Sequence, residues 1–307
     1  HAFVEVPLAN TIKDLWEIVN TSEKFQKHCM MMENVNYGRE ELMFLNICRK
    51  GLLGELYHGE AAYIHDLRWQ MYEEEIGTGS WRTLQYEKKK GNLYPTHGLG
   101  PVSQYMNLLR TDDTFKTLIS FSSPALGREK FARENFKENH KWNKLNYQNG
   151  DINTTVIKTY LGRTIMVQWD ETSPRPYTRL NLIQGTKGIL AGGPTRAAFD
   201  NGFEGYTKDA EEWIIGEGID ALYEKYDHPM YKRLNKITQD SGHGGMDGMM
   251  VYRIIECLRK GEPLDQNVYE GCAWSSLIEL TSNSVNNDGQ PQDFPDFTRG
   301  NWVNTNT

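Results

Sequence analysis

Apolar side chains recur every three to four residues in several stretches of this chain, and this period predicts amphipathic helices. In the first such stretch, Ile12, Leu15, Trp16 and Val19 would share one face of a helix. Gly51, which follows a second apolar stripe, is typical of a helix end. We therefore expect helices at Thr11–Thr21, Asn34–Leu53, Asp209–Ile214, Met246–Arg259 and Val268–Leu280, and one that carries Val102, Tyr105, Met106 and Leu109.

Shorter apolar or alternating runs, many of them bounded by polar and glycine residues, predict strands. Leu161-Gly162-Arg163 between two runs rich in Thr, Ile and Val indicates a hairpin, and Gly185-Thr186-Lys187-Gly188 indicates another. We interpret Gly77–Arg82 as a loop, Arg128–Gln148 as a long excursion, and the residues before about Ser241 as a polar region. The predicted strands are His1–Pro7, Lys27–Glu33, Leu56–Asp66, Leu84–Glu87, Thr117–Ser123, Asp151–Tyr160, Thr164–Asp170, Thr178–Gly185 and Lys187–Ala191.

The order of these elements predicts two parts. Residues 1–36 read as strand, helix and strand, which is typical of the last part of a dinucleotide-binding domain. Residues 37–307 predict a substrate-binding α+β domain with a large, mostly antiparallel sheet and helices at its ends. A dinucleotide-binding half normally carries Gly-x-Gly-x-x-Gly after its first strand. The sequence lacks that motif, so we expect that an N-terminal dinucleotide-binding segment is missing from this chain.

Composition restricts the classes of function. The net charge is −7, which argues against a nucleic-acid partner because such binding needs a basic surface. No apolar stretch approaches the ~20 residues that a membrane span requires. Cys29, Cys48, Cys257 and Cys272 lie far apart without Cys-x-x-Cys spacing. We expect them to be free thiols, mostly buried, which leaves the cellular compartment undetermined.

The stretch from Gly91 to Pro101 concentrates candidate chemistry. Tyr94 and His97 put a phenol and an imidazole within four residues, and Pro95 stiffens the turn between them. The apolar helical pattern that follows puts both side chains at a helix start, where backbone N–H groups are also free. Residue types alone leave open a purely structural alternative, in which Tyr94 packs and His97 caps the helix.

Several blocks of the sequence together resemble glycoside hydrolase family 109, whose members are NAD-dependent α-N-acetylgalactosaminidases within the Gfo/Idh/MocA oxidoreductase superfamily. The resemblance runs from the first residue to about Trp302, and it implies a C-terminal domain of the Gfo/Idh/MocA type. The family's Gly-rich amino-terminal half has no counterpart in this chain. The matching blocks are Met31–Asn34, Tyr37–Glu41, Asn92–Pro101, Thr172–Tyr177, Asn181–Gly188 and Gly242–Asp247.

The resemblance implies that NAD is the cofactor and that a terminal α-linked N-acetylgalactosamine is the substrate, with no metal. Such enzymes oxidise the sugar at C3, which acidifies the C2 proton; elimination expels the aglycone, water adds, and C3 is reduced again. A base with a near-neutral pKa suits abstraction of that proton, which favours His97, with Tyr94 as partner or alternate acid–base group. We assign the two as a catalytic pair without separating their roles.

The resemblance also implies binding roles for residues outside that pair. The superfamily usually has Glu-Lys-Pro where this chain has Glu5-Val6-Pro7, so an amine that relays a hydroxyl proton is absent. From residue type alone, Tyr63 and Tyr177 would be packing aromatics. The positions that match the family's sugar contacts are Tyr63, Arg82, Tyr94, Pro95, Thr96, His97 and Tyr177, and those that match its NAD contacts are Glu5, Val6 and Asn34.

Two other functions stay open. One is a sugar or cyclitol NAD-dependent dehydrogenase with net redox turnover, which the absent lysine disfavours. The other is a non-catalytic carbohydrate-binding or dimerisation fragment, because this chain lacks a full dinucleotide site. For the same reason we expect the isolated chain to hydrolyse poorly, and an exposed sheet face would favour a homodimer.

Three further histidines are weaker candidates. His243 precedes a predicted helix and either faces the site or caps that helix. His58, His65 and Asp66 resemble a metal-ligand cluster, but His58 and Asp66 stand eight residues apart on one predicted strand. That spacing separates them too far for a shared metal ion.

Overall fold

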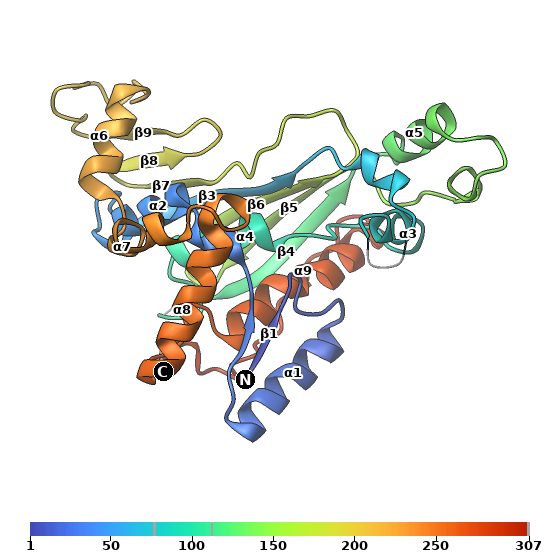
Figure 1. Ribbon diagram of the computed structural model, residues 1–307, viewed down its shortest axis with the longest axis horizontal. Coiled ribbons are helices and arrows are strands. Elements are labelled where there is room, and N and C mark those ends of the chain that lie inside the picture. The colour runs from blue at the N-terminus through green and yellow to red at the C-terminus, as the bar shows by residue number, and fades with distance from the viewer. Residues whose placement is uncertain (76–77, 112, 306–307) are drawn as a thin grey trace.

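The computed structural model describes residues 1–75, 78–111 and 113–305, in which a large sheet lies over a small sheet and its helix (Figure 1). The small sheet consists of β1 (Ala2–Val4) and β2 (Cys29–Met31), which pair in parallel and are joined by α1 (Ile12–Phe25). The Thr11 side chain caps α1 by accepting a hydrogen bond from the backbone N–H of Asp14. The predicted strand–helix–strand opening is therefore confirmed.

The large sheet has the strand order β10-β4-β5-β6-β3-β7-β8-β9. All of its pairs are antiparallel except β3 with β6, which run parallel over His58–Ile64 and Thr164–Asp170. Both predicted hairpins form, and the mostly antiparallel α+β architecture is confirmed. The strands are β3 (Leu56–Ile64), β4 (Phe115–Ser122), β5 (Ile152–Thr159), β6 (Thr164–Asp170), β7 (Leu182–Gly185), β8 (Gly188–Ala191), β9 (Arg196–Phe199) and β10 (Gln292–Asp293).

Most of the helices lie on the side of the large sheet that faces the small one, and others lie at the ends of the large sheet (Figure 1). The longest, α9 (Val268–Asn286), packs on β4 and also contacts α1 and β2, so that it joins the two sheets. Its start is fixed by a capping box between Asn267 and Glu270. The other helices are α2 (Arg39–Arg49), α3 (Trp81–Lys88), α4 (Thr96–Tyr105), α5 (Gly127–Asn135), α6 (Glu217–Tyr226), α7 (Pro229–Thr238) and α8 (Met246–Lys260).

Buried and exposed side chains alternate along β4 and show which face of the large sheet is covered. Leu118 and Ser120 are buried beneath α9, whereas Ile119 and Phe121 are 37% and 56% exposed on the opposite face. Such an apolar, solvent-facing sheet surface is the feature on which the expected homodimer rests, and the dimer stays a prediction. Within the described residues, none of the helices combines the length and the apolar character needed to cross a bilayer.

Three predictions of local structure were wrong. Leu84–Glu87 is not a strand but part of α3, because Thr83 and Tyr86 are buried three residues apart on one helix face. A run of only four residues does not distinguish the repeat of a helix from the alternation of a strand. Of the predicted loop Gly77–Arg82, Gly77 lies outside the described residues, and Trp81 and Arg82 open α3.

The predicted helix Asp209–Ile214 is also absent. Ile214 instead exchanges backbone hydrogen bonds with Ala197 of β9, and α6 begins at Glu217 after Gly216. The region called polar as far as Ser241 contains α6 and α7. The excursion at Arg128–Gln148 carries most of α5, whose buried side is too narrow to give a clear period: only Arg128 and Ala132 are buried in it.

A close helix–sheet contact holds α4 against β3. A Cβ added to Gly98 would lie 2.4 Å from the backbone nitrogen of Ala62 and 2.7 Å from its carbonyl oxygen. Neither backbone atom can move aside without shifting the strand, so the position accepts only glycine. Since the candidate residue His97 directly precedes Gly98 in the first turn of α4, this contact also sets how far that imidazole stands from the sheet.

We expect Gly98→Ala to lower the free energy of unfolding by about 2 kcal/mol, because overpacking against backbone outweighs the better helix propensity of alanine. Urea unfolding followed by circular dichroism measures the change. Lys130→Ala, at an exposed position of α5, is the control and should stay within about 0.5 kcal/mol of the parent. A Gly98→Ala protein as stable as the parent would contradict this account of the packing.

Candidate active site

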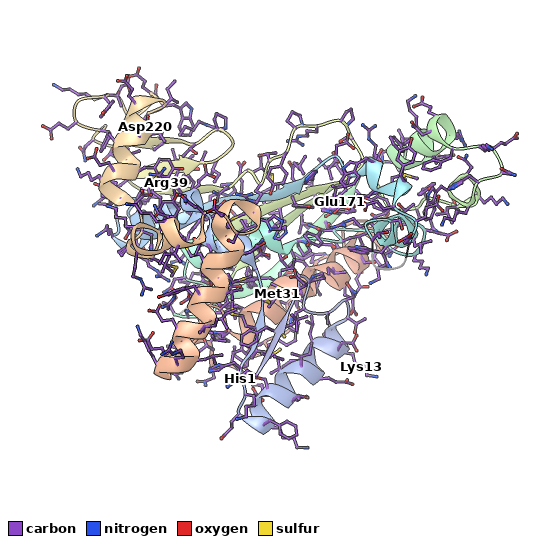
Figure 2. All side chains as sticks on the ribbon, viewed as in Figure 1. His1, Lys13, Met31, Arg39, Glu171 and Asp220 are labelled. Carbon is purple, nitrogen blue, oxygen red and sulfur yellow. The ribbon has the colours of Figure 1, made fainter. Side chains whose placement is uncertain are left out.

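The candidate site lies where the carboxyl ends of two parallel strand pairs meet the start of α4. At the end of β1 and β2 come Glu5 and Glu33, and at the end of β3 and β6 come Tyr63 and Glu171. Ligands bind outside the carboxyl ends of parallel strands in many α/β proteins. Figure 2 labels Met31 on the small sheet and Glu171, which directly follows β6 of the large sheet.

The shortest polar contact of the site joins these two layers. His97 Nδ1 lies 2.6 Å from Glu33 Oε1, and the Glu33 side chain is fully buried. Glu33 Oε1 also accepts a weaker hydrogen bond from the backbone N–H of Val35, at 3.3 Å. Among the described residues, Glu33 Oε2 has no hydrogen-bond partner. The carboxylate orients the imidazole and leaves its Nε2 atom available for proton exchange.

Aromatic rings surround this imidazole. The Tyr63 ring centroid lies 5.3 Å from that of His97, 5.0 Å from that of Tyr94 and 6.2 Å from that of Tyr177. The Tyr94 and His97 centroids are 5.0 Å apart in an edge-to-face arrangement. Burial, together with the charges of Glu33 and Glu171, raises the pKa of the Tyr94 phenol well above its usual value. Burial also raises the pKa of Tyr63.

A clamped arginine forms another wall. The Nε atom of Arg82 donates to Glu171 Oε1 at 3.1 Å, and its Nη1 atom donates to Gln70 Oε1 at 3.2 Å. The guanidinium lies 5.2 Å from the centroid of the Tyr94 ring. Burial alone would lower the pKa of Arg82, but the nearby charge of Glu171 raises it overall. Arg82 therefore presents a fixed cation beside the aromatic rings.

The three residues matched to cofactor contacts lie on the small-sheet side. Asn34 Nδ2 donates to Asp247 Oδ1 at 2.7 Å, and Asn34 Oδ1 is buried without a hydrogen-bond partner among the described residues. Glu5 is exposed just beyond β1, and its charge contributes to the raised pKa of Tyr94. Val6 packs, partly buried, against the main core.

The structure brings five of the predicted substrate residues together and places two behind them. Pro95 and Thr96 are buried, and they support the start of α4 from within. Thr96 Oγ1 has no partner among the described residues. The five that share the cluster are Tyr63, Arg82, Tyr94, His97 and Tyr177.

Sequence reasoning missed the acidic residues that hold this cluster. Glu33 orients His97, Glu171 holds Arg82, and Asp247 holds Asn34. A signal for two of them was present, because Glu33 lies two residues beyond the apolar run at Cys29–Met31 and Glu171 directly follows β6. A carboxylate at the carboxyl end of a buried strand is rarely tolerated without a partner.

The weaker candidates separate in space. His58 at the start of β3 makes a 2.8 Å hydrogen bond with Thr164, and Asp66 beyond its end pairs with Arg68. His65 lies with the aromatic cluster, its ring centroid 5.1 Å from that of Tyr177. Across the described part of the chain, no three His, Cys, Asp or Glu side chains are grouped as metal ligands. All four cysteines are free; Cys257 and Cys272 are buried, and Cys29 and Cys48 partly so.

Sequence comparison places the chain among glycoside hydrolases. The family described as "Glycosyl hydrolase 109, C-terminal domain" matches residues 37–304. "Glycosyl hydrolase family 109 protein 1" of Akkermansia muciniphila is 63% identical over 307 residues, which cover 99% of this chain and 63% of the relative. A protein of the same family from Shewanella sp. (strain W3-18-1) is 58% identical over 303 residues, covering 98% of this chain and 65% of the relative. The chain thus spans less than two thirds of the length of these relatives.

Structural comparison finds oxidoreductases. Levoglucosan dehydrogenase in complex with NADH and levoglucosan superposes with a TM-score of 0.68 at 14% identity, over 96% of this chain and 74% of that one. An inositol dehydrogenase homolog from Azotobacter vinelandii, complexed with NADH and myo-inositol, superposes with a TM-score of 0.56 at 15% identity. The superposition covers 95% of this chain and 71% of the homolog. At this identity the likeness establishes the fold alone: the chain has the fold of the greater part of each of these two oxidoreductases. The family match extends over most of the chain and agrees with the sequence relatives, so the chain belongs to glycosyl hydrolase family 109.

Proposed function

We propose that this protein hydrolyses terminal α-linked N-acetylgalactosamine by a cycle of oxidation, elimination, water addition and reduction that depends on NAD. The observation that carries the proposal is the buried Glu33–His97 pair, which opens onto a cluster of tyrosines and a clamped arginine. An imidazole oriented by a buried carboxylate is suited to proton transfer near neutral pH. The aromatic and guanidinium groups around it are suited to a sugar ring.

The residues at the ends of β1 and β2 fit a nicotinamide. Asn34 Oδ1 is a buried acceptor that lacks a donor among the described residues, and a carboxamide NH₂ would supply one. Asp247 fixes the Asn34 amide so that this oxygen, and not the nitrogen, is left free. When bound, NAD would supply the hydride chemistry at C3 of the sugar. The NADH complexes of levoglucosan dehydrogenase and the inositol dehydrogenase homolog support this assignment by analogy of fold.

His97 performs the proton transfer at C2. Its Nε2 atom takes the C2 proton once the neighbouring carbon has become a ketone, and the Glu33 carboxylate stabilises the imidazolium that forms. The C1–O bond to the aglycone then breaks. After water has added at C1, the imidazolium returns its proton to C2. Because Glu33 is fully buried, its charge acts on His97 with little screening by solvent.

Tyr94 acts in this cycle as a neutral phenol. Its raised pKa keeps the O–H group protonated throughout the physiological range, so it can donate a hydrogen bond to a sugar oxygen. Arg82 is held by Glu171 and Gln70 on one side and can offer its remaining N–H groups to a hydroxyl or to the acetamide carbonyl. Tyr63 and Tyr177 offer flat faces to the ring.

Exchange of the C2 hydrogen tests the proposal directly. The protein as the cell makes it is incubated with NAD and p-nitrophenyl α-N-acetylgalactosaminide in D₂O. We expect free N-acetylgalactosamine that carries deuterium at C2, because the proton returned to that carbon comes from the solvent, and no net accumulation of NADH. Mass spectrometry and absorbance at 340 nm provide the two measurements.

This assay, together with a calorimetric binding measurement, separates the glycosidase from the dehydrogenase and the binding fragment. Accumulation of NADH with an oxidised sugar would identify a dehydrogenase. Sugar binding by calorimetry without turnover in the presence of NAD would identify a binding fragment. The 307-residue chain is assayed in parallel, and we expect it to turn over slowly at best; substantial cleavage by that chain would contradict this part of the proposal.

Glu33→Gln tests how His97 is oriented. The amide keeps a hydrogen bond to Nδ1 but cannot stabilise an imidazolium, so we expect kcat to fall by about 10² to 10⁴-fold with a small change in KM. Glu60→Gln, a partly exposed carboxylate on β3, is the control and should retain parental kinetics. Near-UV circular dichroism checks the fold of both variants. A well-folded Glu33→Gln protein with full kcat would refute the role given to His97.

The raised pKa of Tyr94 makes a prediction about alkaline pH. The native phenol keeps its proton while the unfolded chain loses it at pH ~10, so the stability that this group contributes is complete below pH 10 and declines as the pH rises further. We expect the free energy of unfolding of Tyr94→Phe to fall less steeply above pH 10, by up to about 1.4 kcal/mol per pH unit. Urea unfolding at pH 9 to 11 measures the slopes, with Tyr160→Phe as the exposed-ring control. If the free energy of unfolding declines equally steeply with pH in Tyr94→Phe and in the parent, the raised pKa of Tyr94 is contradicted.

A further inference from the structure

Two consecutive carboxylates in the first turn of α2, Glu40 and Glu41, hold a distant segment of the chain. Oε1 of the buried Glu41 accepts a hydrogen bond from Arg179 Nη2, 138 positions away. Glu40 Oε1 accepts one from Asn181 Nδ2 at 2.7 Å, 141 positions away. The two carboxylates therefore fix two residues of one short segment, which begins two residues after the predicted sugar contact Tyr177.

This segment is also bound to the strand that carries the aromatic cluster. The backbone N–H of Ala62 donates to the carbonyl oxygen of Arg179 at 2.7 Å, and Tyr63 is the next residue of β3. Asn181 has a backbone φ of 50°, in the left-handed region, so the chain turns sharply there before it enters β7. The backbone of the segment thus has little freedom to move relative to Tyr63.

Arg179 connects Glu41 to the aromatic cluster. Its Nη1 atom donates to Tyr177 Oη at 2.7 Å, while its Nη2 atom donates to Glu41. Nε of Arg179 is buried without a hydrogen-bond partner among the described residues, so the two Nη atoms set the orientation of the guanidinium. Burial by itself would lower the pKa of Arg179, but the charge of Glu41 raises it overall.

The hydrogen bond from Arg179 restricts how the Tyr177 phenol can act. A phenol has one hydrogen to donate, and its oxygen accepts. Because Arg179 donates to that oxygen, the phenol hydrogen points away from the guanidinium, and no described residue accepts it. The Tyr177 ring is exposed at the edge of the cluster, with its centroid 6.2 Å from that of Tyr63. Tyr177 is therefore a hydrogen-bond donor whose direction is set from behind.

We propose that Arg179, clamped by Glu41, is a positioning residue that holds Tyr177 so that its hydroxyl group donates a hydrogen bond to an oxygen of the sugar. The inference rests on the proposed glycosidase function and assigns the Glu41–Arg179 pair to the substrate side of the same site. Arg82 can reach the sugar itself, whereas Arg179 acts through the phenol. A donor of this kind binds the substrate and the transition state alike, so its loss raises KM and leaves kcat little changed.

A double-mutant cycle tests whether Arg179 acts through Tyr177. The protein as the cell makes it is assayed with NAD and p-nitrophenyl α-N-acetylgalactosaminide. We expect Arg179→Gln to raise KM about 10-fold and to leave kcat within about threefold of the parent, because one hydrogen bond to the sugar is weakened. Tyr177→Phe, which removes the hydroxyl group, should raise KM by a similar factor. In the Tyr177→Phe background, Arg179→Gln should change KM by less than about twofold, since the hydrogen bond that it controls is already lost.

A milder variant and a matched control accompany the cycle. Glu41→Gln keeps an acceptor for Arg179 and removes only the charge, so we expect KM to rise about threefold, and only when Tyr177 is present. Arg163→Gln breaks an ion pair of similar burial at the other end of β6: Arg163 is 19% exposed and faces the buried Asp113, whereas Arg179 is 18% exposed. This control should lower the melting temperature, as Arg179→Gln does, but change KM by less than about twofold.

The outcomes separate the role of Arg179 from the function on which it rests. Near-UV circular dichroism checks the fold of each variant, and if Arg179→Gln is misfolded, the cycle of Glu41→Gln with Tyr177→Phe decides. If the parent protein does not cleave the substrate, the glycosidase function fails and the inference falls with it. The role of Arg179 is refuted, and the function stands, if the parent is active and Arg179→Gln raises KM equally in both backgrounds, lowers kcat instead, or has no more effect than Arg163→Gln.

Discussion

The hydrogen bond between His97 and Glu33 is the interaction on which the site depends. It crosses from the first turn of α4 to the second residue beyond β2, and so it ties the large sheet to the small one. A carboxylate without access to solvent costs several kcal/mol unless it is paired. Glu33 is fully buried and His97 is its one side-chain partner among the described residues. Burial makes the contact obligatory, and the same contact orients the imidazole.

Glu171, like Glu33, is a buried carboxylate that is paired with cationic or polar groups and fixes a side chain of the cluster. Glu171 lies between two guanidinium groups, with Arg82 Nε at 3.1 Å and the Nη2 atom of the buried Arg128 at 3.9 Å. Arg128 is fixed in turn by Thr83 and by the ring of Tyr86, 4.3 Å from its guanidinium. Arg82 thus has little freedom to move. A fixed cation beside a rigid aromatic wall reduces the entropy lost on binding a polar ligand.

Much of the fold could be predicted from the sequence, because its signals are local. The period of Ile12, Leu15 and Val19 indicated α1, and the turn at Leu161-Gly162-Arg163 indicated the β5–β6 hairpin. The stiff bend before α4 also identified Tyr94 and His97 as neighbours. Where a segment was short, as in α3, or lacked a wide apolar face, as in α5, the local signal was too weak to separate helix from strand or loop.

What only the tertiary structure decided is which distant residues share the site. Glu33 and Glu171 each lie just beyond the carboxyl end of a strand, and parallel pairing of β1 with β2 and of β3 with β6 decides which other strand ends lie beside them. No pattern within a strand encodes the strand with which it pairs. The approach of α4 to β3 at Gly98 then sets His97 against Glu33, 64 positions away in the chain. The sequence by itself determined the reactive groups and most of the elements that carry them. Their orientation depends on contacts between segments far apart in the chain, and such contacts form only when the core packs.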